Sequence, residues 1–388
     1  FINMENLKES FLPQLQSTYG FDDVSILPGV STLDPKDVDT SVKFGKSKLK
    51  IPIIASAMDS AVDVNFASRL SEVGSMGVLN LEGLQTKYEN PTEAFNEITS
   101  CNSQEAIKVI QKFYAEPIKE ELVSLRVQEL KNRGIDAAVS VTPANAERLG
   151  FLARDAGADI IFIQATVISS RHRGKISLNI KDFIERIEIP VVLGNCVTQD
   201  VAYELMQTGP AGILVGIGPG AACTTRAVTG VGVGQVTATM SCCKARDVHF
   251  EKTGKYVSII TDGGMRKGGE ISKAIASGAD AVMLGSCFSG LKETPGEGYH
   301  WGMATQDPNL PRGTRVSVKN MVELEKLFFG PSDRDDGTLN LVGGLKNSMG
   351  MVGAMNIQEM QKATVVHCPS LKDEGKHYQF VDGVGQAK

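Results

Sequence analysis

Two similar stretches decide the fold: AGADIIFIQAT, residues 156–166, and SGADAVMLGS, residues 277–286. In each, a short turn of small residues with a glycine and an aspartate leads into a continuous apolar run. Such runs are typical of strands buried on both faces of a parallel sheet, because a strand with one solvated face alternates apolar and polar residues. A looser copy of the turn, RGIDAA, occupies residues 133–138. The recurrence indicates near-equivalent strand units.

Eight buried strands are predicted along the chain, at residues 51–58, 76–80, 136–141, 159–166, 189–195, 211–218, 257–264 and 280–286. The segments between them carry helical periodicity, and several end in a glycine just before the next strand. Eight strands that alternate with helices predict an α/β protein with a (β/α)8 TIM barrel, a single domain with N- and C-terminal extensions. An open doubly wound sheet is the alternative, and the similar lead-in turns favour the closed barrel.

The composition is that of an ordinary globular protein, with 42% hydrophobic and 22% charged residues among 388. A formal net charge of -5 gives no support to nucleic-acid binding or a membrane-surface role. No window approaches the roughly 18 apolar residues of a membrane span. The seven cysteines are odd in number and lack CxxC spacing, which fits a reducing compartment. We therefore expect a cytoplasmic protein without nucleic-acid or membrane partners.

A glycine-rich loop, GIGPGAACTTRAVTGVGVGQ at residues 216–235, carries the lone thiol of Cys223. A cysteine nucleophile needs solvent access and groups that assist the developing charge. The loop supplies free backbone amides, the hydroxyls of Thr224 and Thr225, and Arg226, and its carbonyls can ligate a cation. An inert packing cysteine is the alternative, but the segment holds little apolar material. The pattern favours a nucleophile.

Two further strand ends indicate a phosphate site. TDGG (residues 261–264) and LGS (residues 284–286) end the seventh and eighth predicted strands, where barrels commonly bind phosphate on glycine amides. Tight turns between strand and helix are the alternative for either motif alone. Their joint occurrence at these two strands favours phosphate. Asp262 can accept hydrogen bonds from a sugar diol, although a turn or helix-cap aspartate fits the sequence nearly as well.

Taken together, these motifs resemble the IMP dehydrogenase and GMP reductase family. The similarity continues through SAMD (residues 56–59), YHWGM (299–303) and GTLNLVGGLKNSMGMVGA (337–354), and it covers residues 20–365 in order. The resemblance implies a (β/α)8 barrel that assembles as a homotetramer or octamer. Members attack position 2 of a purine nucleotide (GMP, IMP or XMP) with the loop cysteine, and they exchange hydride with NADP or NAD.

The resemblance also implies roles by matching positions. Cys223 would be the catalytic nucleophile, and the Thr225 hydroxyl would assist proton transfer. Nucleotide contacts would come from Ser56, Met58, Asn195, Asp262, Gly263, Gly264, Gly285, Ser286, Tyr299, Gly302 and Met303. Cofactor contacts would come from Gln164, Thr166, Gly216 and Gly218. The carbonyls of Gly218, Gly220 and Cys223 would hold a monovalent cation, potassium.

The proportions of the chain place it in a short branch of that family. Residues 20–365 would form the catalytic barrel, with a mobile flap around 288–342, and residues 366–388 a peripheral tail. Full-length IMP dehydrogenases usually insert a pair of CBS modules after the second strand. Only residues 81–135 separate the second and third predicted strands here, which is too few for such a pair. We expect no CBS domain.

Departures from the family pattern bear on the reaction. IMP dehydrogenases activate water with an Arg-Tyr pair on the flap, and this chain has no Arg-Tyr dipeptide. That favours NAD(P)H-dependent reductive deamination of GMP to IMP and ammonia. Reductases, however, carry a glutamate where Arg312 stands, the family aspartate that ends the fourth strand is Gln164, and the loop serine is Ala221. An IMP dehydrogenase with an unconventional base, and a catalytically weak purine-nucleotide sensor or scaffold, remain the alternatives.

Overall fold

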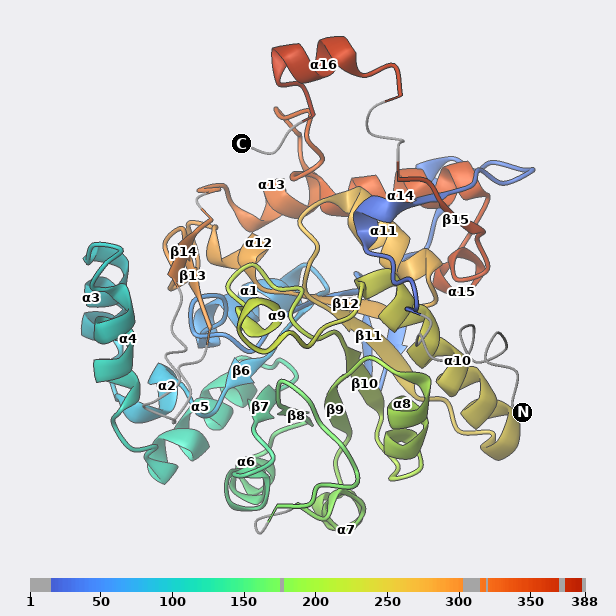
Figure 1. Ribbon diagram of the computed structural model, residues 1–388. Coiled ribbons are helices and arrows are strands. Elements are labelled where there is room, and N and C mark those ends of the chain that lie inside the picture. The colour runs from blue at the N-terminus through green and yellow to red at the C-terminus, as the bar shows by residue number, and fades with distance from the viewer. Residues whose placement is uncertain (1–14, 175–177, 303–314, 319, 370–373, 386–388) are drawn as a thin grey trace, which may run out of the picture.

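The predicted TIM barrel is confirmed (Figure 1). The computed structural model describes residues 15–174, 178–302, 315–318, 320–369 and 374–385. One sheet holds, in the order of its hydrogen-bonded neighbours, β5 (Met76–Gly77), β4 (Ile53–Ala55), β12 (Ala281–Leu284), β11 (Ser258–Asp262), β10 (Gly212–Val215), β9 (Val191–Cys196), β8 (Ile160–Gln164), β7 (Ala138–Val141) and β6 (Leu79–Asn80). Every neighbouring pair is parallel.

The sheet closes on itself through one broken strand. β5 pairs with β4 at one end of the strand order, and β6 pairs with β7 at the other. Only Val78 separates β5 from β6 along the chain, so the two are halves of the second predicted strand. A sheet whose two ends share one strand is a ring, and the open doubly wound alternative is thereby excluded.

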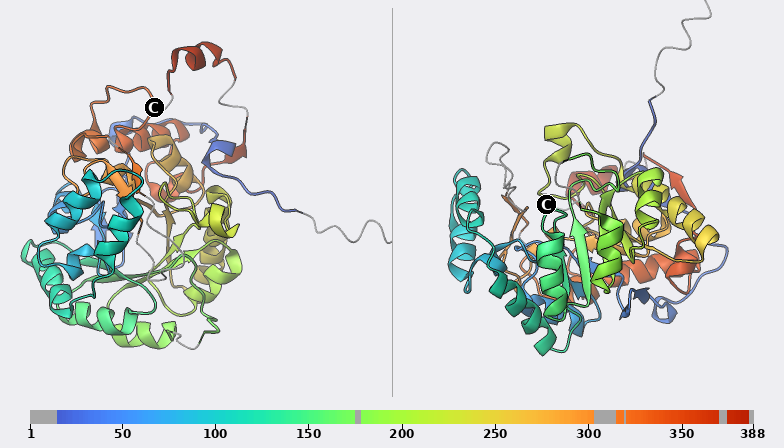
Figure 2. Two further views of the ribbon diagram at one scale, coloured as in Figure 1. Left: turned by 60° about the vertical axis from the view of Figure 1, so that its left-hand side comes forward. Right: turned by 90° about the horizontal axis from the view of Figure 1, so that it is seen from below.

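Helices connect the strands and lie outside the ring, as the two views of Figure 2 show. They are α1 (Val64–Glu72), α5 (Glu120–Asn132), α6 (Phe151–Asp155), α7 (Ile180–Ile187), α8 (Gln199–Met206), α10 (Gln235–Thr253) and α11 (Gly268–Ala276), with the π-helical turn η3 (Ala146–Gly150) before α6. Local sequence sets several ends. The Asp63 carboxylate accepts from the Phe66 amide at 2.7 Å and caps α1. Gly254, at φ 69°, ends α10 in the left-handed conformation that glycine adopts freely.

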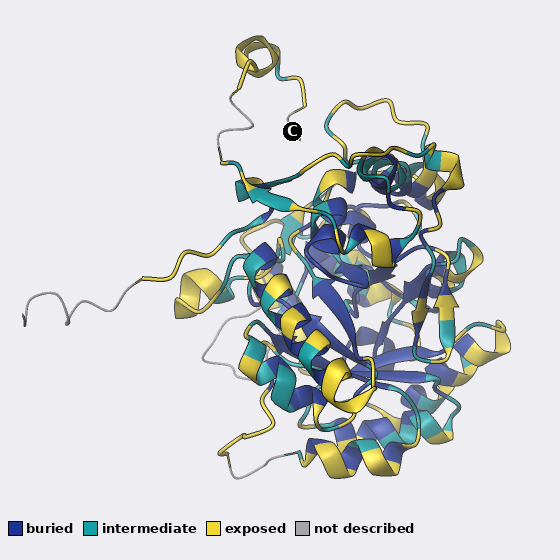
Figure 3. Cartoon of the chain, turned by 90° about the vertical axis from the view of Figure 1, so that its right-hand side faces the viewer, coloured by how far each residue is buried: buried dark blue, intermediate teal, exposed yellow. Residues whose placement is uncertain are grey.

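The core lies inside and immediately around the ring (Figure 3). Strand side chains such as those of Ile54, Phe162, Leu193 and Ile260 are fully buried. Full burial of a large apolar side chain is worth about 1.5–3 kcal/mol. The continuous apolar runs are therefore explained by strands that pack inward against one another and outward against helices.

A second, smaller apolar cluster lies beside the barrel. The segment after β6 folds into α2 (Leu84–Lys87), α3 (Thr92–Ser100) and α4 (Ala106–Tyr114), and it packs beside the hairpin of β13 (Tyr299–Trp301) and β14 (Arg315–Ser317). The buried members of this satellite cluster are Leu84, Ala94, Ile98, Ile110, Phe113 and Trp301. Arg315 ties the hairpin to the end of α3, because its Nη2 donates to the Cys101 carbonyl at 2.8 Å.

The remaining helices and strands are not part of the barrel sheet. They are η1 (Phe21–Asp23), β1 (Val24–Ile26), η2 (Pro35–Asp37), β2 (Val42–Phe44), β3 (Ser47–Leu49), α9 (Thr225–Thr229), α12 (Ser286–Ser289), α13 (Leu324–Phe329), α14 (Leu341–Val352), α15 (Ile357–Met360), β15 (Val365–His367) and α16 (His377–Asp382). β1 pairs with β15, so the predicted tail boundary at residue 366 falls inside a paired strand. α16 has no buried residue and projects from the body (Figure 1). Motion of the predicted flap stays a prediction. No helix among the described residues is long and apolar enough to cross a membrane.

Candidate active site

A cavity of about 820 Å³ opens at the carboxyl ends of the barrel strands. Parallel strands bring their carboxyl ends to one face, so residues far apart in sequence meet there. The predicted site residues that line it are Ser56, Met58, Gln164, Thr166, Asn195, Gly216, Gly218, Gly220, Cys223, Thr225, Asp262, Gly263, Gly264, Gly285, Ser286 and Gly302. The structure thus brings together nearly every predicted position that it describes.

The loop after β10 folds back over the cavity. Gly216, at φ 143°, permits the first turn, and a Cβ there would lie 2.6 Å from Gln235 Nε2 and 2.7 Å from the Asp262 carbonyl. Only glycine fits such a close approach. Arg226 then fastens the loop: its Nε donates to the Ile217 carbonyl at 3.0 Å and its Nη2 to the Val233 carbonyl at 2.7 Å. The glycine-rich loop therefore follows a fixed path over the cavity.

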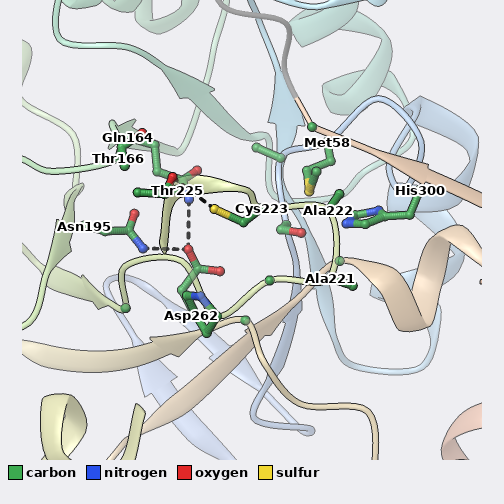
Figure 4. Close-up of a pocket in the computed structure, with 18 of the residues that line it drawn as sticks. Met58, Gln164, Thr166, Asn195, Ala221, Ala222, Cys223, Thr225, Asp262 and His300 are labelled. Carbon is green, nitrogen blue, oxygen red and sulfur yellow. Dashed lines mark hydrogen bonds between the residues drawn. The ribbon is translucent and has the colours of Figure 1, made fainter. Parts of the chain in front are cut away.

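The loop presents Cys223 to the cavity (Figure 4). Its side chain is exposed, and Sγ lies 3.2 Å from Thr225 Oγ1, to which it donates a hydrogen bond. Cys287 differs, because burial raises the pKa of its thiol to about 12. Accessibility and an adjacent hydroxyl are what a nucleophilic thiol requires. Cys223 has both.

A half-buried carboxylate, Asp262 at the end of β11, lines the same cavity as the thiol. Asn195 Nδ2 donates to Asp262 Oδ2 at 2.8 Å, and Gln164 Nε2 donates to the same oxygen at 3.3 Å. Burial nevertheless raises the pKa of Asp262 to about 6, because desolvation outweighs the two amide bonds. Both bonds end on Oδ2, so Oδ1 is the oxygen available to a ligand hydroxyl. The Gln164 amide is thus engaged with Asp262.

The two glycine turns predicted to hold phosphate lie side by side. Gly263 and Gly264, at φ 80° and 83°, follow β11, and Gly285 and Ser286 follow the neighbouring strand β12. All four line the cavity. Ser56 lies against them, because a Cβ on Gly285 would come within 2.8 Å of its Oγ. Glycines at these positions bring the backbone to the cavity wall, where the Gly263 amide already donates to the Met283 carbonyl at 2.9 Å.

Tyr299 is not among the described residues that line the cavity, and its predicted nucleotide contact stays a prediction. Its ring packs in the satellite cluster, 4.3 Å from the Arg315 guanidinium carbon. His300 lines the cavity instead. Successive side chains of a strand point to opposite faces, so β13 sends only one of the two neighbours into the site. Met303, also predicted to contact nucleotide, lies outside the described residues.

Glu82, Lys87 and Tyr114 are among the cavity residues that were not predicted. Glu82 accepts hydrogen bonds from the Thr142 amide and, at 2.8 Å, from Asn145 Nδ2. These residues follow β6 in the segment that builds the satellite cluster. Only the position of Glu82, two residues beyond the strand, signals its role in the sequence.

A buried network links this wall to the hairpin. The Tyr114 hydroxyl donates to Asp59 Oδ2 at 2.5 Å and accepts from Trp301 Nε1 at 3.1 Å. Burial raises the pKa of Asp59 to about 6 and lowers the pKa of nearby Lys87. Side chains from the end of β4, from α4 and from β13 are thus held together, so the wall depends on elements that sequence reasoning treated separately.

Comparison with known proteins agrees with this geometry. Residues 18–314 match the model of the IMP dehydrogenase / GMP reductase domain. The chain belongs to the IMP dehydrogenase / GMP reductase family. An uncharacterized oxidoreductase of Mycolicibacterium smegmatis is 36% identical, over 89% of this chain and 95% of that protein. The inosine-5'-monophosphate dehydrogenase of Cryptosporidium parvum is 30% identical, over 88% of this chain and 90% of its own length.

A solved structure gives the same family. An IMP dehydrogenase/GMP reductase-like protein from Corynebacterium glutamicum superposes with a TM-score of 0.87 at 32% identity, and the match covers 92% of this chain and 96% of that one. The chain is therefore an oxidoreductase of the IMP dehydrogenase / GMP reductase family on a TIM barrel.

The family's nicotinamide cofactor fits the free space. The cavity lies in the upper part of the roughly 300–1,000 Å³ range of small-molecule sites. Beyond Asp262 its wall continues through Gln164, Ser140 and Thr142, all polar. The Asn80 amide nitrogen on the same wall is buried without a hydrogen-bond partner among the described residues. An orphaned buried donor fits a polar ligand that supplies the acceptor.

The predicted cation site stays a prediction. Gly218 and Gly220 line the cavity beside Cys223. The Gly220 carbonyl already accepts from the Cys223 amide at 3.0 Å, which shapes the turn that carries the thiol. A carbonyl oxygen has a second lone pair, so this bond leaves room for a cation at the same oxygen.

Proposed function

We propose that the protein reduces GMP to IMP and releases ammonia, with NADPH or NADH as the reductant. The observation that carries the proposal is the Cys223 thiol, exposed at the cavity and hydrogen-bonded to Thr225 at 3.2 Å. The balanced reaction joins GMP, reduced cofactor and two protons, and it yields IMP, oxidised cofactor and ammonium. Asp262 holds the ribose diol, and the turns of Gly263–Gly264 and Gly285–Ser286 receive the phosphate.

The first step belongs to Cys223. Its thiolate adds to purine C2, a C–S bond forms, and the electron pair moves onto the ring nitrogen. The Thr225 hydroxyl accepts the thiol hydrogen bond and stands beside the sulfur, where it passes a proton toward the departing group. The C2 amino group leaves as ammonia once protonated, and the C2=N double bond re-forms in the cysteine-bound purine. Proton help of this kind is typically worth 10²–10⁴-fold in rate.

The second step breaks the C–S bond. When bound, a reduced nicotinamide would supply a hydride equivalent to C2. The Cys223 sulfur then leaves with the C–S electron pair as thiolate, and IMP is released. The loop helps here because Arg226 keeps its two ends together through bonds of 3.0 and 2.7 Å, so the thiolate stays against C2. Neither step consumes water.

The direction rests on what the chain offers as a water-activating group. Hydrolysis of the cysteine-bound purine needs a base, and the sequence between residues 303 and 344 contains no tyrosine and no Arg-Tyr pair. Reduction needs no such base. The relatives named inosine-5'-monophosphate dehydrogenase support the alternative, oxidation of IMP with NAD and water to XMP and NADH.

An assay of the purified protein separates these possibilities. With GMP and NADPH or NADH, the reductase proposal expects cofactor oxidation that matches ammonia and IMP formation one to one. Faster production of XMP from IMP and NAD would assign the dehydrogenase reaction instead. Binding of GMP or IMP without either reaction would assign a sensor or scaffold. The Cys223→Ala variant is the matched control, because it removes the thiol and leaves the rest of the cavity.

A further inference from the structure

A second cavity, of about 760 Å³, lies among the helices that surround the barrel. Its walls come from the start of α1, from α2 and α3, from one side of α5 and from residues 292–297, which precede β13. The segment that holds α2 and α3 lies beside the hairpin in Figure 1. No described residue lines both this cavity and the active site, so the proposed reaction gives the second cavity no role.

The second cavity carries an excess of negative charge. The described residues that line it include five carboxylates and three cationic side chains, which are those of Asp63, Glu89, Glu129, Glu293, Glu297, Arg126, Arg133 and Lys292. Arg126 and Glu129 neutralise each other, because Arg126 Nη1 lies 3.0 Å from both Glu129 carboxylate oxygens. Of the other six, only Asp63 and Glu293 are half-buried, and the rest are exposed. The less exposed charges are thus both acidic, and such a lining attracts a cation.

Gln85 of α2 presents a buried amide on the wall of this cavity. Its side chain is 4% exposed, and Nε2 has no hydrogen-bond partner among the described residues. Its backbone carbonyl accepts from Arg126 Nε at 2.9 Å, which holds α2 against α5. Buried donors without a partner are rare in native proteins. The Gln85 amide therefore calls for an acceptor atom on a bound molecule.

Glu293 presents the complementary need on the same cavity. Its Oε1 accepts from the Leu324 amide at the start of α13, at 3.2 Å. Its Oε2 is buried and has no hydrogen-bond partner in the part of the chain that the structure describes. A carboxylate oxygen out of water is stabilised best by a charged donor. A ligand with a cationic N–H group and a neutral acceptor oxygen would satisfy both Gln85 and Glu293.

We propose that the second cavity binds a small organic amine that also carries a hydroxyl or carbonyl oxygen. Its ammonium group is held by Glu293, and its oxygen accepts from the Gln85 amide. The volume is within the roughly 300–1,000 Å³ range of small-molecule sites. This inference does not rest on the proposed reaction, because it uses neither Cys223 nor a purine nucleotide.

Other ligand classes fit the lining less well. An anion would meet the excess of carboxylates. A linear polyamine carries only donors when protonated, so it would leave the Gln85 amide unpaired. A bare metal ion has no acceptor for that amide either, and among the described residues no group of three or more histidine, cysteine, aspartate or glutamate side chains is arranged to hold one. The lining therefore favours an amine with an oxygen.

Three matched cyclic probes separate the charge from the acceptor. trans-4-Aminocyclohexanol carries both groups, cyclohexylamine carries only the ammonium, and 1,4-cyclohexanediol carries only oxygens. Their affinities are measured by ligand-observed NMR titration at pH 7, without nucleotide or cofactor. We expect saturable binding of the amino alcohol. The diol should bind at least about tenfold more weakly, because it lacks the charge, and cyclohexylamine about 2- to 10-fold more weakly, the value of one neutral hydrogen bond.

Two variants localise that binding. Glu293→Gln keeps an oxygen for the Leu324 amide but removes the charge, and it should weaken the amino alcohol on the order of 10- to 100-fold. Gln85→Leu removes the amide at similar size. It should lower the amino alcohol's affinity to that of cyclohexylamine and leave cyclohexylamine unchanged. Glu121→Gln is the control, because it removes an exposed charge of α5 that lines neither cavity.

Other results would overturn the assignment. Binding of the amino alcohol that does not saturate, or that equals binding of the diol, would show a cavity filled only by water. Equal losses in E121Q and E293Q would show a general effect of charge. Circular dichroism establishes folding, and if E293Q does not fold, Q85L decides alone through its selective effect on the amino alcohol. Failure to turn over GMP would reject the proposed reaction and leave these affinities untouched.

Discussion

At the scale of single residues, the proposed chemistry depends on two side chains. One is a thiol in the loop after β10, and the other is a carboxylate at the end of the neighbouring strand β11. Cys223 is exposed in the loop after β10, and Asp262 is half-buried at the end of β11. In the proposed reaction the thiol makes and breaks the bond to the substrate, while the carboxylate holds the sugar. Their different surroundings make these roles separable by mutation.

Replacing the thiol should abolish turnover and spare binding. For Cys223→Ala we expect a loss of more than about 10³-fold in kcat, as for other covalent nucleophiles, with GMP affinity within a few-fold of the unmodified protein. Thr225→Ala should keep the adduct but slow proton transfer, by about 10²–10⁴-fold. Steady-state kinetics and intact-protein mass measure the two effects. Appreciable turnover in C223A would exclude the covalent route.

Asp262 should make sugar binding pH-dependent. Folding raises the pKa of its carboxyl from 3.8 to about 6, so below pH 6 the free protein holds a proton there and loses an acceptor for the diol. Guanosine affinity should therefore fall as the pH drops through about 6. The phosphate-free ligand keeps phosphate titration out of the measurement. An affinity that is flat between pH 5 and 8 would place the sugar elsewhere.

The raised pKa of Asp262 affects the stability of the fold in the opposite direction, since it favours the folded state at low pH. A carboxyl whose pKa is raised on folding contributes stability at low pH, and this contribution is lost as the pH rises from 3.8 through about 6. Asp262→Asn removes the partly desolvated charge. We expect its free energy of unfolding at pH 8 to exceed that of the unmodified protein by about 1–3 kcal/mol, and the gain to vanish near pH 4. Urea titrations at the two pH values measure it.

At the scale of elements, the loop after β10 works because a few positions fix its path. Gly216 has no room for a side chain, with Gln235 Nε2 at 2.6 Å from where a Cβ would sit. Gly216→Ala should displace the Cys223 loop and cut kcat at least about tenfold, since strained backbone costs about 1–3 kcal/mol. Gly269→Ala on α11, where nothing lies within 4 Å, is the control and should retain activity. Equal activity in both variants would contradict a fixed loop.

The hairpin illustrates what sequence reasoning reaches and where it stops. The sequence singled out Tyr299 from YHWGM, whereas the period of two in a strand sends only one of the two neighbours, Tyr299 and His300, toward the cavity. His300 is the residue at the cavity. Glu82, Lys87 and Tyr114 were missed for another reason. All three follow β6, and Lys87 and Tyr114 lie in helices whose approach to the cavity depends on long-range packing against Trp301.

At the scale of the whole molecule, strand count and lead-in turns predicted the barrel. Buried apolar runs reveal strands one by one, and the repeated turn reveals their equivalence. The break at Val78, which splits the second strand into β5 and β6, was not predictable, because MGVLN reads as one continuous run. The satellite cluster was not predictable either, because it forms through contacts between segments that are far apart in the sequence.

Mutations in the two apolar clusters should differ in how much of the molecule they destabilise. Phe162→Ala empties a fully buried position of the ring and should cost about 3–5 kcal/mol of global stability. Arg315→Ala releases only the tie between hairpin and α3. Hydrogen exchange should show faster exchange confined to α3, α4 and the hairpin, with the barrel strands unchanged. Exchange that spreads through the barrel in R315A would show one cooperative unit.

The central claim is that the cysteine-bound purine exchanges ammonia at C2 and is not hydrolysed. One experiment tests it. The purified protein is given IMP, oxidised cofactor and ammonium, which start the reaction from the product side. The reductase account predicts that the Cys223 adduct is detected by intact-protein mass and that the nucleotide recovered is GMP. Recovery of XMP as the main product, at a rate unaffected by ammonium, would contradict it.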